Sequence, residues 1–202
     1  MDRNRHIDIM GIVNVTDDSF YSSSRCRDAG VAIERIAAMA AEGADIIDLG
    51  ACSSRPGSSG VGPEEEWRRL EPVLKEFKKE FPTLRLSVDT YWSDVVRRTY
   101  DLVGDFIVND ISAGEDDSGM LPAVAELGLV YVAMHKKGGP ADMQSKAVYD
   151  NVTEEVAEYF NKFSVKASEA GIKEWILVRL VIILPRSRMI CLGFSSLSTH
   201  SG

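Results

Sequence analysis

Polar side chains that can recognise a polar ligand recur at the ends of short apolar runs along the chain. The residues at these ends are Asn14, Asp48, Asp89, Asn109 with Asp110, and Met134 with His135. A carboxylate accepts two hydrogen bonds from an amidine-like pair of N–H groups, and an amide both donates and accepts. A single aspartate after a strand commonly caps the following helix. Five such ends in one chain instead indicate a shared site for a polar heterocycle.

Two polar loops could complete that site. Residues 14–28 are long and rich in hydroxyl groups, which is typical of a lid that closes over a ligand. Residues 53–62, SSRPGSSGVG, place Arg55 among serines and glycines. A guanidinium in this setting suits a phosphate or a carboxylate, and a solvated surface arginine is the alternative on this pattern alone.

The elements that must position these residues alternate regularly. The apolar runs are at 7–14, 44–50, 84–90, 105–112 and 129–137. The helical patterns that follow them are at 29–43, 62–81, 93–104, 119–128 and 151–171. The runs lack polar alternation, as expected for a parallel sheet covered by helices. This order fits an open doubly wound sheet or a closed (β/α)8 barrel. The nucleotide fingerprints GxGxxG and GxxxxGK[ST] are absent, which favours the barrel, whose active site lies at the carboxyl ends of its strands.

Composition narrows the class of protein. The chain has 202 residues, 45% of them hydrophobic, and a formal net charge of −8. This balance predicts a soluble globular protein that binds neither nucleic acid nor an anionic membrane. The apolar run Trp175–Leu184 is too short to span a bilayer. Cys26, Cys52 and Cys191 show no paired spacing, so we expect free thiols, a reducing compartment and a cytoplasmic location.

Five segments together resemble dihydropteroate synthase, the pterin-binding enzyme of folate biosynthesis that sulfonamides inhibit. They are IMGIVNVTDDSF, GADIIDLGACSSRPGS, LSVDTYWSDVV, FIVNDISAG and VAMH, in the family's order from Ile9 to Leu177. The resemblance implies a (β/α)8 barrel that condenses 6-hydroxymethyl-7,8-dihydropterin diphosphate with 4-aminobenzoate. The products would be 7,8-dihydropteroate and diphosphate, with Mg2+ assisting. Family members are often homodimers.

The resemblance also assigns roles to individual residues. Asn14 matches the asparagine that helps to hold magnesium and diphosphate, and Arg55 with Ser54 matches a pair near the aminobenzoate and the diphosphate. The residues implied for the closing part of the first loop are Asp18, Ser19 and Phe20. Those implied for the pterin pocket are Asp48, Asp89, Asn109 and Met134, with Asp89 addressing the pterin ring.

The sequence departs from the family pattern at three places in this region. Asp17 stands where the family usually has proline, Cys52 stands where glutamate is common, and HKKG replaces HMRG after residue 134. An aspartate in place of the proline loosens the loop and adds a negative charge near the expected diphosphate. None of the three by itself excludes activity.

The family pattern ends after Leu177. In the family, the strand containing WIL continues into Asp-Pro-Gly, and two further units supply a lysine and an Arg-x-His; none of these follows here. All 31 acidic residues precede Val178. We therefore expect a partial pterin-binding barrel over 1–177, with about five and a half βα units, and a divergent, irregular tail over 178–202. The hypothesis is a truncation or a reading-frame change, with open sheet edges, poor solubility and impaired activity.

Three other functions stay open on the sequence. The first is a synthase that stays active without the missing units, and the second is a pterin-binding module of the methyltetrahydrofolate-binding type that lacks synthase activity. The NVTxDSF and SRPG loops favour the synthase, because they serve diphosphate and aminobenzoate rather than a methyl carrier. The third is a helix-covered α/β domain without a ligand.

Overall fold

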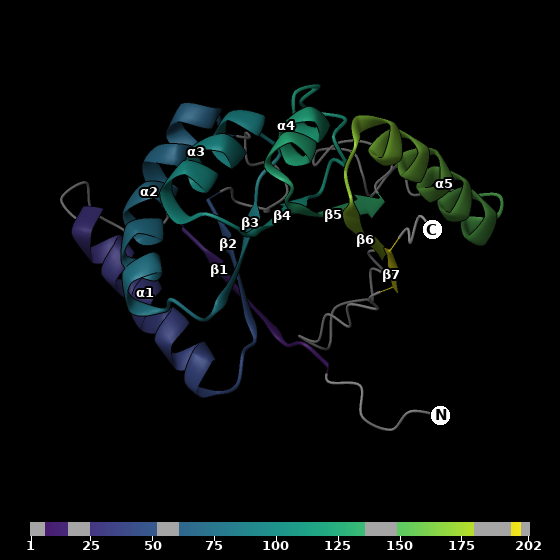
Figure 1. Cartoon of the computed structure of the whole chain (residues 1–202). Coiled ribbons are helices and arrows are strands. Elements are labelled where there is room, and N and C mark those ends of the chain that lie inside the picture. The colour runs from purple at the N-terminus through teal and green to yellow at the C-terminus, as the bar shows by residue number, and fades with distance from the viewer. Residues whose placement is uncertain (1–6, 16–24, 52–60, 136–148, 180–194, 199–202) are drawn as a thin grey trace.

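The computed structural model describes residues 7–15, 25–51, 61–135, 149–179 and 195–198. Strands and helices alternate along the chain (Figure 1). In order they are β1 Met10–Asn14, α1 Arg25–Ala41, β2 Ile46–Gly50, α2 Pro63–Glu80, β3 Arg85–Asp89, α3 Ser93–Val103, β4 Ile107–Asp110, α4 Met120–Leu127, β5 Val130–His135, α5 Val152–Ala170, β6 Glu174–Arg179 and β7 Ser195–Ser198.

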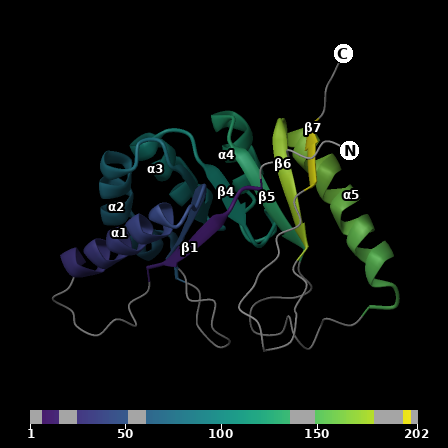
Figure 2. The ribbon, with the colours of Figure 1, turned by 90° about the horizontal axis from the view of Figure 1, so that it is seen from below.

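One sheet contains all the described strands in the order β1-β2-β3-β4-β5-β6-β7. Neighbours from β1 to β6 are parallel, and β7 pairs with β6 in the antiparallel sense. The sheet curves, and the five helices lie along its outer side (Figures 1 and 2). The fold is therefore α/β, and it forms part of the wall of a barrel, as the strand–helix alternation predicts.

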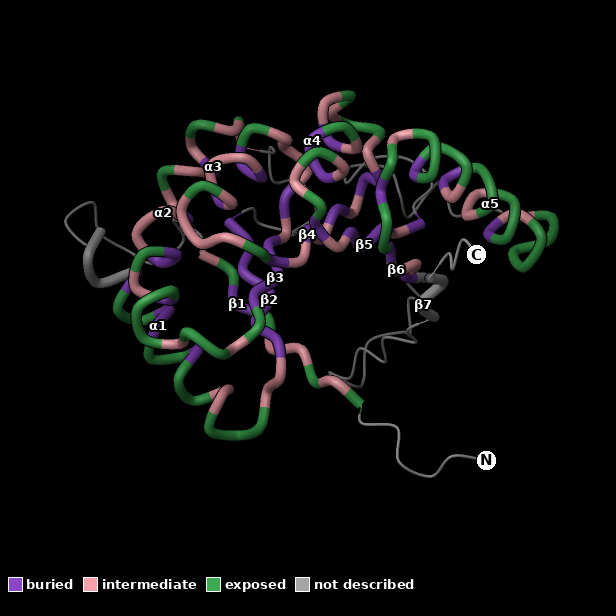
Figure 3. Tube along the Cα trace, in the orientation of Figure 1, coloured by how far each residue is buried: buried purple, intermediate pink, exposed green. Residues whose placement is uncertain are grey.

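The core lies between the sheet and the helices. In each strand, every second side chain faces the helices. Leu49, Val88 and Val108 face this way in β2, β3 and β4 and are fully buried. Figure 3 shows the buried residues along the strands and on the sides of the helices that face them. The other set of alternate residues faces the concave side, because successive strand side chains point to opposite faces. Of the predicted polar residues, that concave side holds Asn14, Asp48, Asp89 and Asn109.

Local sequence explains why the helices begin where they do. Pro63 occupies the first turn of α2, where its missing N–H removes no helix bond, and three glutamates follow it near the positive end of the helix dipole. The α5 helix starts at Asn151, whose side chain accepts hydrogen bonds from the backbone of Thr153 and Glu154. Both helices then bury an apolar stripe against the sheet.

The predicted strands and helices up to residue 171 all have a counterpart. The predicted sixth strand is β6, which extends to Arg179, two residues beyond Leu177. The four residues of β7 fall within 178–202, where the sequence predicts irregular backbone. The domain boundary at Leu177 remains a prediction.

Candidate active site

Four neighbouring strands bring their ends together in one row. The register aligns Asn14 with Gly50, Gly50 with Asp89, and Asp89 with Asn109. Because these strands are parallel, the row lies at their shared carboxyl end, where barrels carry their sites. Residues separated by up to 95 positions along the chain thus form one polar row.

Asp48 lies one layer below this row and is 5% exposed. Its carboxylate accepts hydrogen bonds from Ser87 Oγ at 2.6 Å and from Asn109 Nδ2 at 3.1 Å. Burial raises the pKa of Asp48, and these two hydrogen bonds act in the opposite direction. The bond from Asn109 orients its amide, so that the amide oxygen is available as an acceptor on the concave side.

Asp89 shares this environment and its negative charge. Burial, followed by the charges of Asp48, Glu66 and Asp110, raises the pKa of Asp89 to about 7. A carboxyl group in this condition exchanges its proton near neutral pH. It can therefore match a ligand that presents N–H groups, because ionisation makes it a two-point acceptor.

Gly50 allows the row to be this compact. A Cβ added at Gly50 would lie 2.8 Å from Asn14 Oδ1 and 3.4 Å from Asp89 Oδ2. No side chain fits there unless Asn14 moves. The glycine therefore permits the close approach of the two functional side chains on either side.

The structure separates two pairs of residues that the sequence places together at strand ends. Asn109 is half-buried and donates to Asp48 on the concave side, whereas Asp110 is fully buried on the helix side and bonds Tyr131. His135 is also buried, with its ring centroid 4.8 Å from that of Tyr159 in α5. Asp110 and His135 thus lie behind the predicted site rather than in its row.

Of the remaining predicted site residues, the structure describes only Met134. Met134 follows the same alternation as Val132 and is half-buried near the end of β5. Asp18, Ser19, Phe20, Ser54 and Arg55 lie outside the described residues. Sequence reasoning missed Ser87 and Gly50. The available signal for Ser87 was its position two residues before Asp89, which puts both on the same face of a strand.

A metal would need oxygen donors at this row. Among the described residues, no three His, Cys, Asp or Glu side chains lie close enough together to hold a metal ion. The exposed amide of Asn14 offers one oxygen ligand. Magnesium commonly takes one or two protein ligands and completes its shell with substrate phosphates and water. Asn14 fits that kind of site.

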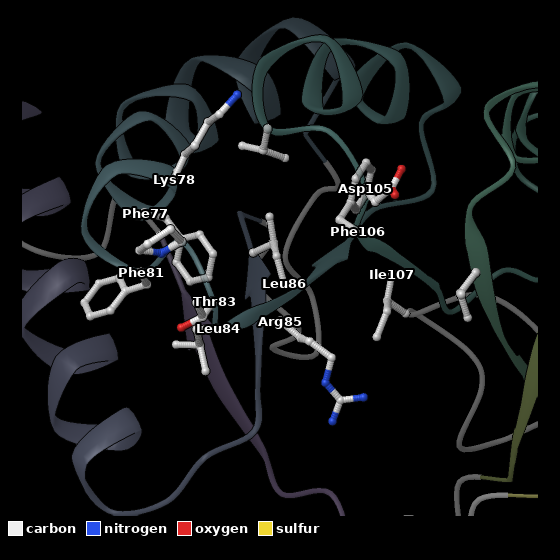
Figure 4. A pocket seen from close by; sticks show the side chains of 13 residues that line it. Phe77, Lys78, Phe81, Thr83, Leu84, Arg85, Leu86, Asp105, Phe106 and Ile107 are labelled. Carbon is white, nitrogen blue, oxygen red and sulfur yellow. The ribbon is translucent and has the colours of Figure 1, made fainter.

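A separate cavity of about 500 Å³ opens at the opposite, amino-terminal end of β3 and β4 (Figure 4). Its walls are largely apolar and include Phe77, Phe81, Leu86 and Phe106. Its two cations already have partners: Lys78 donates to the Leu102 carbonyl at 2.7 Å, and Arg85 pairs with Asp8 at 2.7 Å. The polar row and this cavity are distinct.

Across the described part of the chain, no helix combines the length and the apolar character needed to cross a bilayer.

Residues 10–183 match a family described as pterin binding enzyme. Dihydropteroate synthase of Escherichia coli (strain K12) is 39% identical over 174 residues, which cover 86% of this chain and 61% of that protein. The mitochondrial folate synthesis bifunctional protein of Pisum sativum is 38% identical over 182 residues, 88% of this chain and 35% of that protein. The chain thus spans between about a third and three fifths of these relatives.

Solved structures agree with this match. Dihydropteroate synthase of Xanthomonas albilineans with 4-aminobenzoic acid superposes with a TM-score of 0.71 at 38% identity, covering 82% of this chain and 57% of that one. The synthase of Clostridium difficile in the presence of pteroic acid gives a TM-score of 0.76 at 33% identity, covering 88% and 65%. The curved sheet and its helices are therefore similar to those of these enzymes over the part that the chain covers.

Proposed function

The chain belongs to the pterin-binding enzyme family, and from this premise we propose that it carries the pterin-recognition part of a dihydropteroate synthase site. The reaction joins 6-hydroxymethyl-7,8-dihydropterin diphosphate to 4-aminobenzoate, giving 7,8-dihydropteroate and diphosphate. The observation that supports this most directly is the Asp48–Asn109–Asp89 group at the carboxyl ends of β2, β3 and β4. It offers acceptors and an oriented amide to a heterocycle rich in N–H groups.

Each residue of this group has a chemical role in the proposal. Ionised Asp89 accepts hydrogen bonds from the N–H groups of the pterin ring, and the Asn109 amide, held by Asp48, completes recognition of the ring edge. When diphosphate leaves, positive charge develops on the methylene carbon and is shared with the ring. The nearby carboxylates stabilise that charge because they are fixed in place before it forms. Met134 contributes an apolar contact to the ring.

The anionic end of the substrate requires the residues of the first two loops. In the proposal Asn14 holds Mg2+, and Ser54 and Arg55 bind near the diphosphate and the aminobenzoate. Asp18, Ser19 and Phe20 close over the bound substrates. Magnesium, when bound, neutralises part of the charge on the departing diphosphate. The aniline nitrogen attacks while neutral, so no strong general base is needed.

The proposal also covers inhibition by sulfonamides, the location in the cell and the oligomeric state. The synthase of Yersinia pestis has been solved with a sulfonamide drug complex, and we propose that sulfonamides compete with 4-aminobenzoate here as well. A cytoplasmic location is proposed from the expected free thiols. A homodimer is implied for the full-length family, and the mass of the protein in solution tests whether this chain forms one.

The test combines binding with turnover. The protein is titrated with pterin diphosphate and Mg2+, 4-aminobenzoate is added, and 7,8-dihydropteroate is measured. Asp89→Asn should weaken pterin binding by about 10- to 100-fold, because it replaces a charged acceptor at a half-buried position. Asp105→Asn, an exposed carboxylate outside the polar row, is the matched control and should leave binding unchanged.

The outcomes separate the candidate functions. Binding that depends on Asp89 without any product fits a truncated synthase with impaired activity. Binding that depends on Asp89, followed by product formation, supports a synthase that stays active without the missing units. Equal binding by wild type and Asp89→Asn would show that the polar row is not the pterin site.

A further inference from the structure

Asp110 follows Asn109 directly in β4, but its side chain points to the opposite side of the sheet. It is fully buried. Its carboxylate accepts three hydrogen bonds, from the Ser112 N–H at 2.6 Å, the Gly114 N–H at 2.9 Å and the Tyr131 hydroxyl at 2.6 Å. Hydrogen bonds to a charged group are roughly twice as strong as neutral ones. Asp110 therefore ties the end of β4 both to the loop after it and to β5.

The loop that Asp110 holds has an unfavourable backbone. Ala113 and Gly114 lie in the left-handed region, with φ of 51° and 77°. Residues other than glycine rarely adopt this region, and a Cβ at Gly114 would also come within 3.0 Å of Leu121. The two backbone bonds to Asp110 lie on either side of Ala113. They stabilise the conformation that the loop sequence alone disfavours.

Tyr131 fixes the other side of Asp110. Its ring is fully buried and stacks on Phe163 of α5, with centroids 5.8 Å apart and planes at 12°. Burial, and then the neighbouring charge of Asp110, raises the pKa of Tyr131. The phenol therefore keeps its proton and remains a donor to Asp110 through the whole physiological range of pH.

The contacts of Asp110 constrain its neighbour Asn109 as well. Its carbonyl accepts a hydrogen bond from the Thr90 N–H at 3.1 Å, and its side chain donates to Asp48. Thr90, the residue after β3, therefore holds the backbone of Asn109 on one side. The next residue of β4, Asp110, is held on the other side of the sheet by its own hydrogen bonds. We propose that Asp110 and Tyr131 are positioning residues that act from the helix side of the sheet to aim the Asn109 amide at Asp48 and at the ring edge of a bound pterin.

The part of this inference that concerns pterin rests on the proposed function, whereas the aiming of Asn109 does not. The first measurement therefore uses the protein without ligand. Tyr131→Phe removes only the hydroxyl and keeps the ring stacked on Phe163, and Asp110→Asn removes the charge at nearly constant shape. Ile36→Val in α1 is the control, because it removes one buried methyl group far from β4.

Two signals are followed by NMR: amide exchange of Ser112 and Gly114, and the side-chain amide resonance of Asn109. Both should change in Tyr131→Phe and Asp110→Asn, with exchange about five- to tenfold faster than in wild type, the effect of one lost hydrogen bond. In Ile36→Val both signals should stay as in wild type, although global stability falls. Unchanged signals in the two site variants overturn the inference.

The second measurement is the affinity for pteroic acid. Tyr131→Phe and Asp110→Asn should weaken it about five- to tenfold, and Ile36→Val should not. If the Asn109 resonance moves and the affinity stays the same, the positioning role is overturned. If wild type itself does not bind pteroic acid, the proposed function fails, and the ligand-free NMR comparison still decides how Asn109 is held.

Discussion

At the scale of single residues, Asp89 carries a conflict between folding and function. Burial and the neighbouring carboxylates raise its pKa to about 7, well above the value of about 3.9 in an unfolded chain. In the proposed function, the pterin ring binds the ionised form. The surroundings that create the site therefore penalise the charge state that the ligand requires, and ligand binding must supply the difference.

The sign of the pH effect on stability follows from this shift. Below about pH 4 Asp89 is protonated in both the folded and the unfolded chain. As pH rises to about 7 the folded state keeps the proton longer, so the Asp89 contribution to the free energy of unfolding falls and then stays constant. Asp89→Asn should therefore raise the melting temperature relative to wild type at pH 8, with the gap closing near pH 4.

Thermal melts of both proteins across this range measure the gap. Asp105→Asn is the control and should show no comparable pH-dependent gain. A melting temperature of Asp89→Asn that lies below that of wild type at pH 8 would contradict the prediction, because it would mean that Asp89 stabilises the fold when ionised.

Gly50 gives a second prediction at the same scale. Gly50→Ala places a methyl group 2.8 Å from Asn14 Oδ1, so Asn14 must move and binding of Mg2+ with pterin diphosphate should weaken at least about tenfold. Gly30→Ala in α1 meets nothing within 4 Å and should stabilise the protein by about 0.5–1 kcal/mol, because alanine favours helix. Calorimetric titration and denaturant melts test the pair. Equal ligand affinity in Gly50→Ala and wild type would rule out the close approach as a functional requirement.

At the scale of elements, one carboxylate joins two neighbouring loops. Asp117, in the loop before α4, accepts hydrogen bonds from the Ser93 N–H at 2.7 Å and the Gly119 N–H at 2.8 Å. It thereby caps α3 from outside that helix. Burial opposes the charge of Asp117, but the bonds from Ser93 and Gly119 outweigh it and lower the pKa. The loops that follow β3 and β4 are thus held as one unit beside the polar row.

Asp117→Ala should destabilise the protein by about 1 kcal/mol, the usual effect of losing a helix cap, and should speed amide exchange at Ser93 and Gly119. Asn151→Ala removes the cap of α5 and should cause a similar loss of stability. Only Asp117→Ala should weaken pteroic acid binding, because the hydrogen-bond partners of Asn151, namely Thr153, Glu154 and Glu155, all lie in α5. Denaturant melts, exchange and titration provide the comparison. Equal effects of the two variants on binding would show that the loop clamp does not support the site.

At the scale of the whole molecule, apolar residues are exposed at one end of the described sheet. The strand order puts β1 at that end, and Ile7, Ile9 and Ile12 there are 78%, 58% and 40% exposed. Apolar side chains at a sheet edge favour association between chains. This end of the sheet is therefore the surface at which we expect chains to associate.

Ile9→Lys should reduce self-association without a large change in stability. The hydrogen bonds of this position with Asp45 use its backbone, so a lysine side chain keeps them and adds a repulsive charge. Sedimentation velocity over a range of concentrations measures the effect. Val165→Lys on the exposed side of α5 is the control for added charge alone. If both variants associate as wild type does, another surface drives association.

The sequence predicts some parts of the site and not others. The ends of the strands and the polar residues there follow from the apolar runs and the residues that close them, which are local signals. Which member of a neighbouring pair faces the ligand is not local. Asn109 and Asp110 are both polar and adjacent, and only the register of β4 with β3 and β5 assigns the first to the site and the second to the support behind it.

The sequence by itself determined the strand–helix alternation, the α/β class and the resemblance to a pterin-binding enzyme, because hydrophobic period and short motifs are properties of contiguous residues. Only the tertiary structure decided that Ser87 and Asn109 hold Asp48, that Asp89 titrates near pH 7, and that Asp110 braces the site through Tyr131. Each of these depends on how deeply a side chain is buried and which distant side chains surround it. That environment forms only when separate strands pack side by side.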